Sequence, residues 1–403
     1  DWSSDVCSSD LHVDPYAYFR EVLRRDPGDV RANTQMGIKA RRDGDNETAK
    51  AYLRRAIARQ TANYTRPSDA EAMYNLGLVL KSEGRWGDAV DTLYRAAWDY
   101  AYASAAYYQL AQISSLRGDR DQAMVETLSA INYNGLNLDA KNLRTTLLRY
   151  EGRLTEALAL AKEVASEDPL NYYAARELSM LQGGGYEQLL RGDPENYLEL
   201  ALYYFNNGFP DDGRSVLESS ESKKPYPTVE YYLGYLAQTA DGDGQQAEQW
   251  YHRAAALSTD YVYPFRLETA RVLEMATEKC PGDAIAWYYL GNLWYQRQPE
   301  RARECWERTV SLDTSFVMAL RNLAWYWRFK DEYTDKDSSD YDKAIDYYLK
   351  AIASDTQGRA LLLTECDETM ELAGAPLSQR FALFEGREQV YRKRYDSETR
   401  ALR

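Results

Sequence analysis

Residues 70–96 read AEAMYNLGLVLKSEGRWGDAVDTLYRA, and this stretch decides the fold. Apolar residues recur every three or four positions in each half, which predicts two amphipathic helices. The halves are separated by Glu83-Gly84-Arg85, where a glycine suits the left-handed conformation that ends a helix. Gly77 and Ala89 are small, so the two helices can approach closely. We therefore expect a tightly packed helix pair.

The same pattern recurs along the chain. It is made by Gly77, Ala89, Leu93 and Ala96 in one unit, and by Ala111, Ala123, Thr127 and Ala130 in the next. The unit starts implied near Ala70, Ser104 and Leu138 are 34 residues apart. A fixed period of this length is typical of a repeat architecture, and the pattern predicts eight to ten helical units.

The period, the Leu-Gly in the first half and the alanines in the second resemble the tetratricopeptide repeat. This resemblance implies an all-α fold, a right-handed α-solenoid of stacked helix pairs. More narrowly, strings such as Tyr263-Pro264-Phe265-Arg266 resemble the C-terminal repeat tail of a family of large bacterial proteins. The N-terminal half of those proteins is a domain of unknown function similar to a β-sandwich. Any catalysis in that family would belong to the other half.

The domain organisation follows from where the pattern holds. Residues 1–11, DWSSDVCSSDL, resemble a translated sequencing adapter of the kind that contaminates metagenomic assemblies, and we expect them to be non-native. We expect 12–28 to be the second helix of a truncated repeat and 29–263 to be the first part of the array. Residues 264–280 should form an extra helix, and 281–403 the last part of the array, with a degenerate, truncated end. A fragment with open ends is expected to self-associate.

Composition excludes several classes of function. The 403 residues carry 49 basic and 63 acidic side chains, a net charge of −14, which argues against a nucleic-acid partner. Mean hydropathy is −0.65 and no apolar run approaches the ~18 residues that span a bilayer, so we expect no membrane partner. Two histidines and four scattered cysteines predict no metal site, and no catalytic or cofactor motif occurs, so neither an enzyme nor a cofactor is expected. The compartment stays open, with the cytoplasm favoured.

The 35 tyrosines are the unusual feature of the composition. The resemblance implies that some repeat positions face neighbouring helices and others face a concave groove. The packing positions hold Trp287, Trp294, Trp306, Trp327 and Tyr204. The predicted groove residues are Tyr74, Tyr108, Gln112, Tyr231, Tyr235, Tyr288, Asn292, Tyr295, Arg321, Trp325 and Arg328. Further charged groove positions are Arg31, Arg41, Arg42 and Lys81. In the alternative interpretation, the tyrosines are partly buried and pad a tightly wound superhelix.

One patch is expected in the last part of the array. Tyr288, Asn292 and Tyr295 occupy groove positions of one repeat, and Arg321, Trp325 and Arg328 occupy them in the next. Rings, an amide and guanidinium groups together suit a ligand with apolar and anionic parts. Alternatively, Trp325 closes the groove by folding onto the insertion at 331–340. The carboxylate clamp of chaperone-binding tetratricopeptide domains is disfavoured, because its lysine position is tyrosine here.

These patterns predict a non-catalytic interaction scaffold. Its groove would bind a peptide, a protein partner or the protein's own missing N-terminal domain. The alternative is an accessory region of a carbohydrate-active enzyme, in which the aromatic side chains contact glycan.

Overall fold

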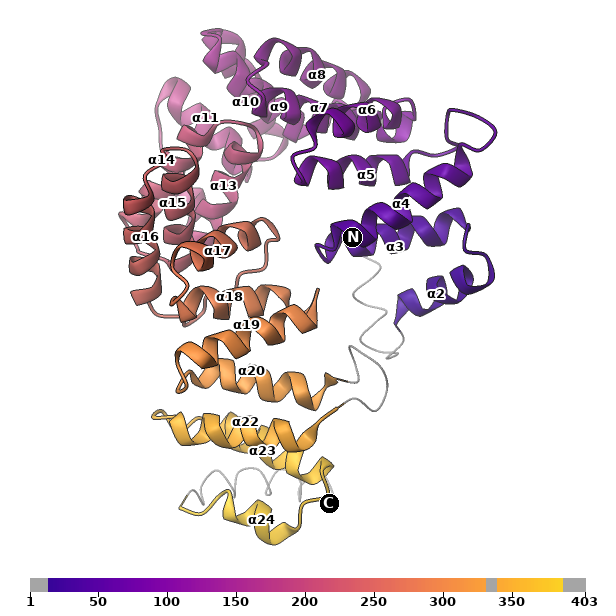
Figure 1. Ribbon diagram of the computed structural model, residues 1–403. Coiled ribbons are helices and arrows are strands. Elements are labelled where there is room, and N and C mark those ends of the chain that lie inside the picture. The colour runs from indigo at the N-terminus through magenta and orange to yellow at the C-terminus, as the bar shows by residue number, and fades with distance from the viewer. Residues whose placement is uncertain (1–13, 331–338, 387–403) are drawn as a thin grey trace, which may run out of the picture. The chain divides into compact units, whose positions relative to one another are not determined.

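The helix pair expected at residues 70–96 is present in the computed structural model of the protein (Figure 1). Helix α5 spans Glu71–Ser82 and α6 spans Trp86–Ala96. Gly84 between them has a φ of 71°, in the left-handed region, as the turn prediction requires. Gly118, Gly152 and Gly208, in the equivalent turns of three other helix pairs, have φ values of 80°, 76° and 81°. The prediction of the turns is therefore confirmed.

The structure describes residues 14–330 and 339–386, which contain helices and no strands. The chain divides into unit 1, which ends at Pro225, and unit 2, which begins at Tyr226. The predictions made for residues 1–11, for the insertion at 331–338 and for 387–403 lie outside the described residues.

Unit 1 contains α2 (Pro15–Arg25), α3 (Val30–Arg42), α4 (Asn46–Gln60), α5, α6, α7 (Tyr100–Leu116), α8 (Arg120–Tyr133), α9 (Leu138–Tyr150), α10 (Leu154–Glu167), α11 (Tyr172–Gln182), α12 (Glu187–Leu190), α13 (Pro194–Asn206) and α14 (Pro210–Glu221). Unit 2 contains α15 (Pro227–Thr239), α16 (Gly244–Ala256), α17 (Glu268–Lys279), α18 (Ala284–Trp294), α19 (Pro299–Leu312), α20 (Val317–Arg328), α22 (Tyr341–Ser354), α23 (Ala360–Leu372) and α24 (Leu377–Ala382). The predicted all-α solenoid of stacked helix pairs is confirmed within each unit, because pairs such as α5–α6 and α18–α19 pack against each other and on the helix that follows, α7 or α20.

Close contact between the two helices of a pair makes the core. A Cβ atom on Gly77 would lie 2.6 Å from Cγ of Leu93, and one on Gly291 would lie 2.3 Å from the indole of Trp306. Tyr204, Trp294 and Trp306 are buried, as predicted for packing positions, whereas Trp287 and Trp327 are partly exposed. The small residue on the first helix therefore leaves the space that a large side chain of the second helix fills.

Unit 1 also makes contacts between residues that are almost one hundred positions apart. The turn after α13 lies against the end of α7, where Ser115 Oγ donates to the carbonyl of Asn207 at 2.6 Å. A Cβ atom on Gly208 would lie 2.9 Å from the carbonyl group of Ser115. Only glycine allows this approach of the two backbones. One end of the face formed by the first helices is consequently covered by the chain itself.

Candidate functional site

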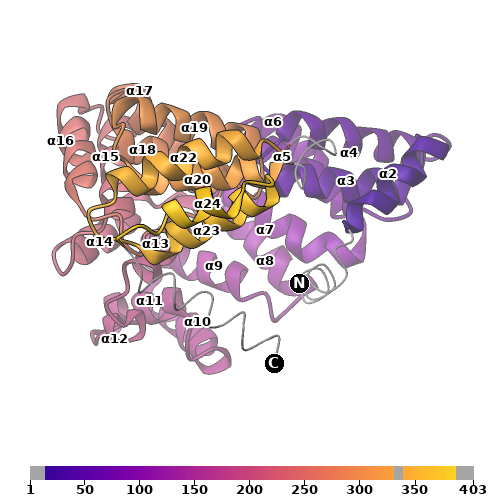
Figure 2. The ribbon, with the colours of Figure 1, turned by 90° about the horizontal axis from the view of Figure 1, so that it is seen from below.

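The described part of unit 1 holds a group of polar side chains on three consecutive first helices, α3, α5 and α7. These helices pack side by side (Figure 2). We call the group the Lys81 network; its members are Arg41 on α3, Tyr74 and Lys81 on α5, and Gln109 and Gln112 on α7. The charged pair Arg41 and Lys81 occupy the same position in successive repeats, four residues after Gly37 and Gly77.

Lys81 has two hydrogen-bond acceptors, and both are neutral. Its Nζ donates to Oε1 of Gln109 at 2.7 Å and to Oε1 of Gln112. Within residues 14–330 and 339–386, no carboxylate pairs with this ammonium group. Burial without a counter-charge lowers the pKa of Lys81 to about 7. The amine therefore exchanges its proton near neutral pH.

Arg41 is in the same situation. Its Nε donates to Oδ1 of Asn75 at 3.1 Å, which is again a neutral acceptor. Burial, together with the positive charge of Arg42, lowers the pKa of Arg41. The hydroxyl of Tyr74 lies near the side chain of Gln109 and in the field of Arg41, so Tyr74 lies between the surroundings of the two cations. The Lys81 network is thus a continuous polar cluster with positive charge and no acid of its own.

The other end of the network is closed. Gln112 Nε2 donates to the hydroxyl of Tyr108 at 2.9 Å and to Oδ1 of Asn207 at 2.9 Å, and Gln112 is only 5% exposed. The predicted open position of Gln112 is therefore wrong, because the α13–α14 turn returns onto α7. Tyr108 stays partly exposed beside it, while burial raises its pKa well above the usual value. At the Gln112 end of the network, Tyr108 is therefore a partly buried packing residue, as the alternative interpretation of the tyrosines expects.

In unit 2 the predicted arginines are already neutralised. Arg321 Nε donates to Oε2 of Glu365 at 2.8 Å in a two-pronged ion pair, and Arg328 pairs with Glu368 at 3.2 Å. Burial opposes the charge of Arg321, but the hydrogen bond and charge of Glu365 outweigh it, so its pKa is raised. We call these four residues and Trp325 the Arg321 network. Both carboxylates come from α23, the first helix of the pair that follows α20 and α22.

The rest of the predicted patch in unit 2 also makes internal contacts. Oδ1 of Asn292 accepts from the indole of Trp306 at 3.1 Å and from Asn322 at 2.9 Å. Tyr288 is 6% exposed, with its ring centroid 4.9 Å from that of Phe316. Tyr295 is partly exposed and packs on Trp306. The structure brings the two repeats together as predicted, but the expected exposure of Tyr288 is wrong, because Phe316 covers its ring.

The predicted open position of Tyr231 is also wrong. It is fully buried, and its hydroxyl donates to Oδ2 of Asp283 at 2.8 Å. The extra helix α17 packs on α15 and brings Asp283, the N-cap of α18, against the face that would have been open. Tyr235, one turn further along α15, remains partly exposed.

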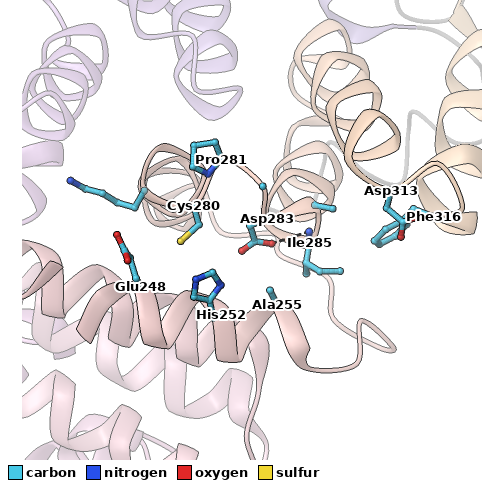
Figure 3. Close-up of a pocket in the computed structure, with 12 residues that line it drawn as sticks. Glu248, His252, Ala255, Cys280, Pro281, Asp283, Ile285, Asp313 and Phe316 are labelled. Atoms are coloured by element: carbon cyan, nitrogen blue, oxygen red, sulfur yellow. Dashed lines mark hydrogen bonds between the residues drawn. The ribbon is translucent and has the colours of Figure 1, made fainter. Parts of the chain in front are cut away.

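A cleft of about 570 Å³ lies between α16 and the turn that joins α17 to α18 (Figure 3). Figure 3 shows the side chains of Glu248, His252 and Cys280 facing one another across it. This set does not make an activated nucleophile: burial, aided by Asp283 and Glu248, raises the pKa of Cys280 and keeps the thiol protonated. Asp283 is occupied by Tyr231 and by the backbone N–H groups of Ile285 and Ala286.

The residues that decide these environments were not predicted. Gln109, Asn207 and Glu365 had no signal in the sequence, because their positions in the repeat do not show which cation they will meet. Lys81 and Arg41 were recognised as charged groove positions only. No helix among residues 14–330 and 339–386 is both long and apolar enough to cross a membrane.

Comparison with known proteins agrees with the repeat assignment. A family model for the tetratricopeptide repeat matches residues 34–106 in unit 1 and 292–359 in unit 2. The chain therefore contains tetratricopeptide repeats in both units. Among solved structures it is similar to a tetratricopeptide repeat protein from Parabacteroides merdae, with 14% identity over 65% of this chain and 99% of that chain, at a TM-score of 0.38. It is also similar to YrrB, described as a TPR protein with an unusual peptide-binding site, with 16% identity over 51% and 92% of the two chains and a TM-score of 0.32.

Proposed function

We propose that this chain is a non-catalytic protein-interaction scaffold. Its binding surface is the first-helix face of unit 1 on α3, α5 and α7, and its ligand is an extended peptide segment of a partner protein. The observation that carries this proposal is the Lys81 network: two cations and a tyrosine ring that remain partly exposed, with neutral partners only. An aromatic ring with a polar tip beside a cation is a common composition for a protein contact surface.

The equivalent surface of unit 2 is a weaker candidate. There Arg321 and Arg328 are bound to α23, and Asn292 is bound to Trp306 and Asn322. A ligand would have to displace these contacts before it could bind. The predicted patch at Tyr288, Tyr295 and Trp325 therefore stays a secondary proposal.

Peptide phage display against the immobilised full chain tests this function. We expect enriched peptides whose affinity falls at least about tenfold, or about 1.4 kcal/mol, in Tyr74→Ala. The matched control is Tyr235→Ala, a partly exposed groove position of unit 2, which should leave affinity unchanged. Circular dichroism should show equal helix content in both variants. Enriched peptides that ignore Tyr74→Ala but lose binding in Tyr235→Ala would move the site to unit 2 and overturn the proposal.

A further inference from the structure

We propose that Lys81 and Arg41 form a binding site for the carboxylate of an acidic side chain in an extended peptide. This inference rests on the proposed function, because it specifies which chemical group of the peptide binds and where. The site differs from the clamp excluded on sequence grounds, since both cations lie four residues after the small residue of the first helix.

Charge is the first argument for this site. A partly buried cation normally has a carboxylate near it, since burial of an unpaired charge is unfavourable. Two lysines of unit 1 follow this rule: Lys50 pairs with Glu47 and Glu83, and Lys141 pairs with Glu163 and Glu167. Arg144 in the same unit does not, since it donates to the carbonyl of Met124 and to the hydroxyl of Thr127. Lys81 and Arg41 instead use the amide oxygens of Gln109, Gln112 and Asn75. In a chain of net charge −14, two cations of consecutive repeats that both lack a carboxylate partner stand out.

Among residues 14–330 and 339–386, the side chains whose hydrogen bonds or charges connect to Lys81, Tyr74 and Arg41 come from three helices. Arg41 and Arg42 come from α3, Tyr74 from α5, and Gln109, Gln112 and Tyr108 from α7. Asp139 on α9 acts on Tyr108 through its charge and accepts a hydrogen bond from Tyr203 at 3.1 Å. A carboxylate from outside would therefore supply the counter-charge that both cations lack.

A side-chain carboxylate is favoured over a chain terminus by the position of the site. Lys81 lies on the middle helix of three, with α3 on one side and α7 on the other. An extended segment that crosses these helices continues past the cations in both directions, so the group that meets them belongs to an internal residue. Carboxylate binding should also stabilise the charged form of Lys81, whose pKa burial lowers to about 7. Binding therefore takes up a proton at neutral pH, because a glutamate carboxylate is already ionised there.

The direct test follows the titration of Lys81 in the full chain by NMR, with ¹³C-labelled lysine. The probes are acetylated, amidated Ala-Glu-Ala, the matched peptide Ala-Gln-Ala, N-acetylglycine as a terminal carboxylate, and inorganic phosphate. We expect Ala-Glu-Ala to raise the apparent pKa of Lys81 by about one pH unit, which corresponds to tenfold tighter binding to the protonated form. Ala-Gln-Ala should have no effect, and the signal of Lys350, an exposed lysine paired with Asp346, should not move.

Two variants distinguish charge from structure. Lys81→Arg should keep Ala-Glu-Ala binding and lose the decrease of about fivefold expected in the wild type between about pH 6 and pH 8, since arginine stays charged. Lys81→Met should lose binding at both pH values while keeping its helix content. A Lys81 titration that Ala-Glu-Ala does not move, or that only N-acetylglycine or phosphate moves, would overturn the inference. Display peptides that need Tyr74 but contain no acidic residue would overturn it too, and would leave the proposed function intact.

Discussion

Lys81 in unit 1 and Arg328 in unit 2 occupy the same place in their repeats, four residues after the small residue of the first helix, Gly77 or Ala324. Their surroundings are opposite. Arg328 pairs with Glu368 at 3.2 Å and donates to the carbonyl of Glu365, whereas Lys81 donates only to the amide oxygens of Gln109 and Gln112. The next first helix makes this difference, since α23 supplies carboxylates and α7 supplies glutamines.

The comparison shows that one repeat position can serve two purposes. In unit 2 the cations join neighbouring repeats, because a buried ion pair with good geometry strongly penalises the loss of either partner. In unit 1 Arg41 and Lys81 keep a charge that has no carboxylate partner, at a cost to stability. A buried cation that has no carboxylate partner suggests a ligand that supplies one.

The largest effect is expected from Glu365→Gln in unit 2. Arg321 would lose its two-pronged ion pair with a carboxylate that is 7% exposed. We expect the free energy of unfolding to fall by about 3 kcal/mol in urea titrations followed by circular dichroism. The control Asp346→Asn removes an exposed pair with Lys350, in which both side chains are more than half exposed, and should cost under about 1 kcal/mol. Equal losses in the two variants would show that the Arg321 network is not structural.

A packing feature shared by both units should give the next largest effect. Gly291→Ala places a Cβ atom 2.3 Å from the Trp306 indole, and Gly77→Ala places one 2.6 Å from Leu93. We expect each to cost about 1–3 kcal/mol through overpacking, measured by the urea midpoint. Ala89→Leu and Ala123→Leu, at fully buried positions, should cost a similar amount. Gly87→Ala is the control, since nothing lies within 4 Å of its added atom; a drop in its midpoint would count against the explanation.

Gln109→Glu would place a carboxylate beside the cation in unit 1, as Glu365 and Glu368 do in unit 2. A carboxylate 2.7 Å from Lys81 Nζ supplies the missing counter-charge, so we expect a stabilisation of about 1 kcal/mol at neutral pH. The same variant should no longer bind Ala-Glu-Ala, because the site would be occupied by its own acid. Thermal melts and the NMR titration measure the two effects. Undiminished peptide binding would mean that Lys81 is not the contact.

The effect expected from Lys81→Met depends on pH. Burial lowers the pKa of Lys81 in the folded state to about 7, below the 10.5 of an unperturbed lysine, so the folded state disfavours the charge. The penalty is complete below the folded pKa and disappears as the pH rises through the unfolded pKa. We expect Lys81→Met to raise the melting temperature most below about pH 7, with a gain that disappears near about pH 10. A gain independent of pH would assign the effect to packing instead.

The sequence by itself determined the helices, their turns and their pairing. These features depend on local signals: apolar spacing predicts the helices, Gly84 and its equivalents have the left-handed φ that ends them, and Gly77 accommodates Leu93 sixteen residues later. The packing of Tyr204 and Trp306 followed from the same repeat positions. Local sequence signals are sufficient for these features because the contacts lie within one helix pair, as between Gly77 and Leu93.

Only the tertiary structure decided which groove positions are open and which cations are paired. The partners that decide this come from other repeats: Gln109 is 28 residues from Lys81, Glu365 is 44 from Arg321, and Asn207 is 95 from Gln112. Tyr231 became core because the extra helix α17 brings Asp283 against it. A repeat position specifies the direction of a side chain, but the charge and shape that it meets depend on how neighbouring repeats stack, and a single repeat does not encode that.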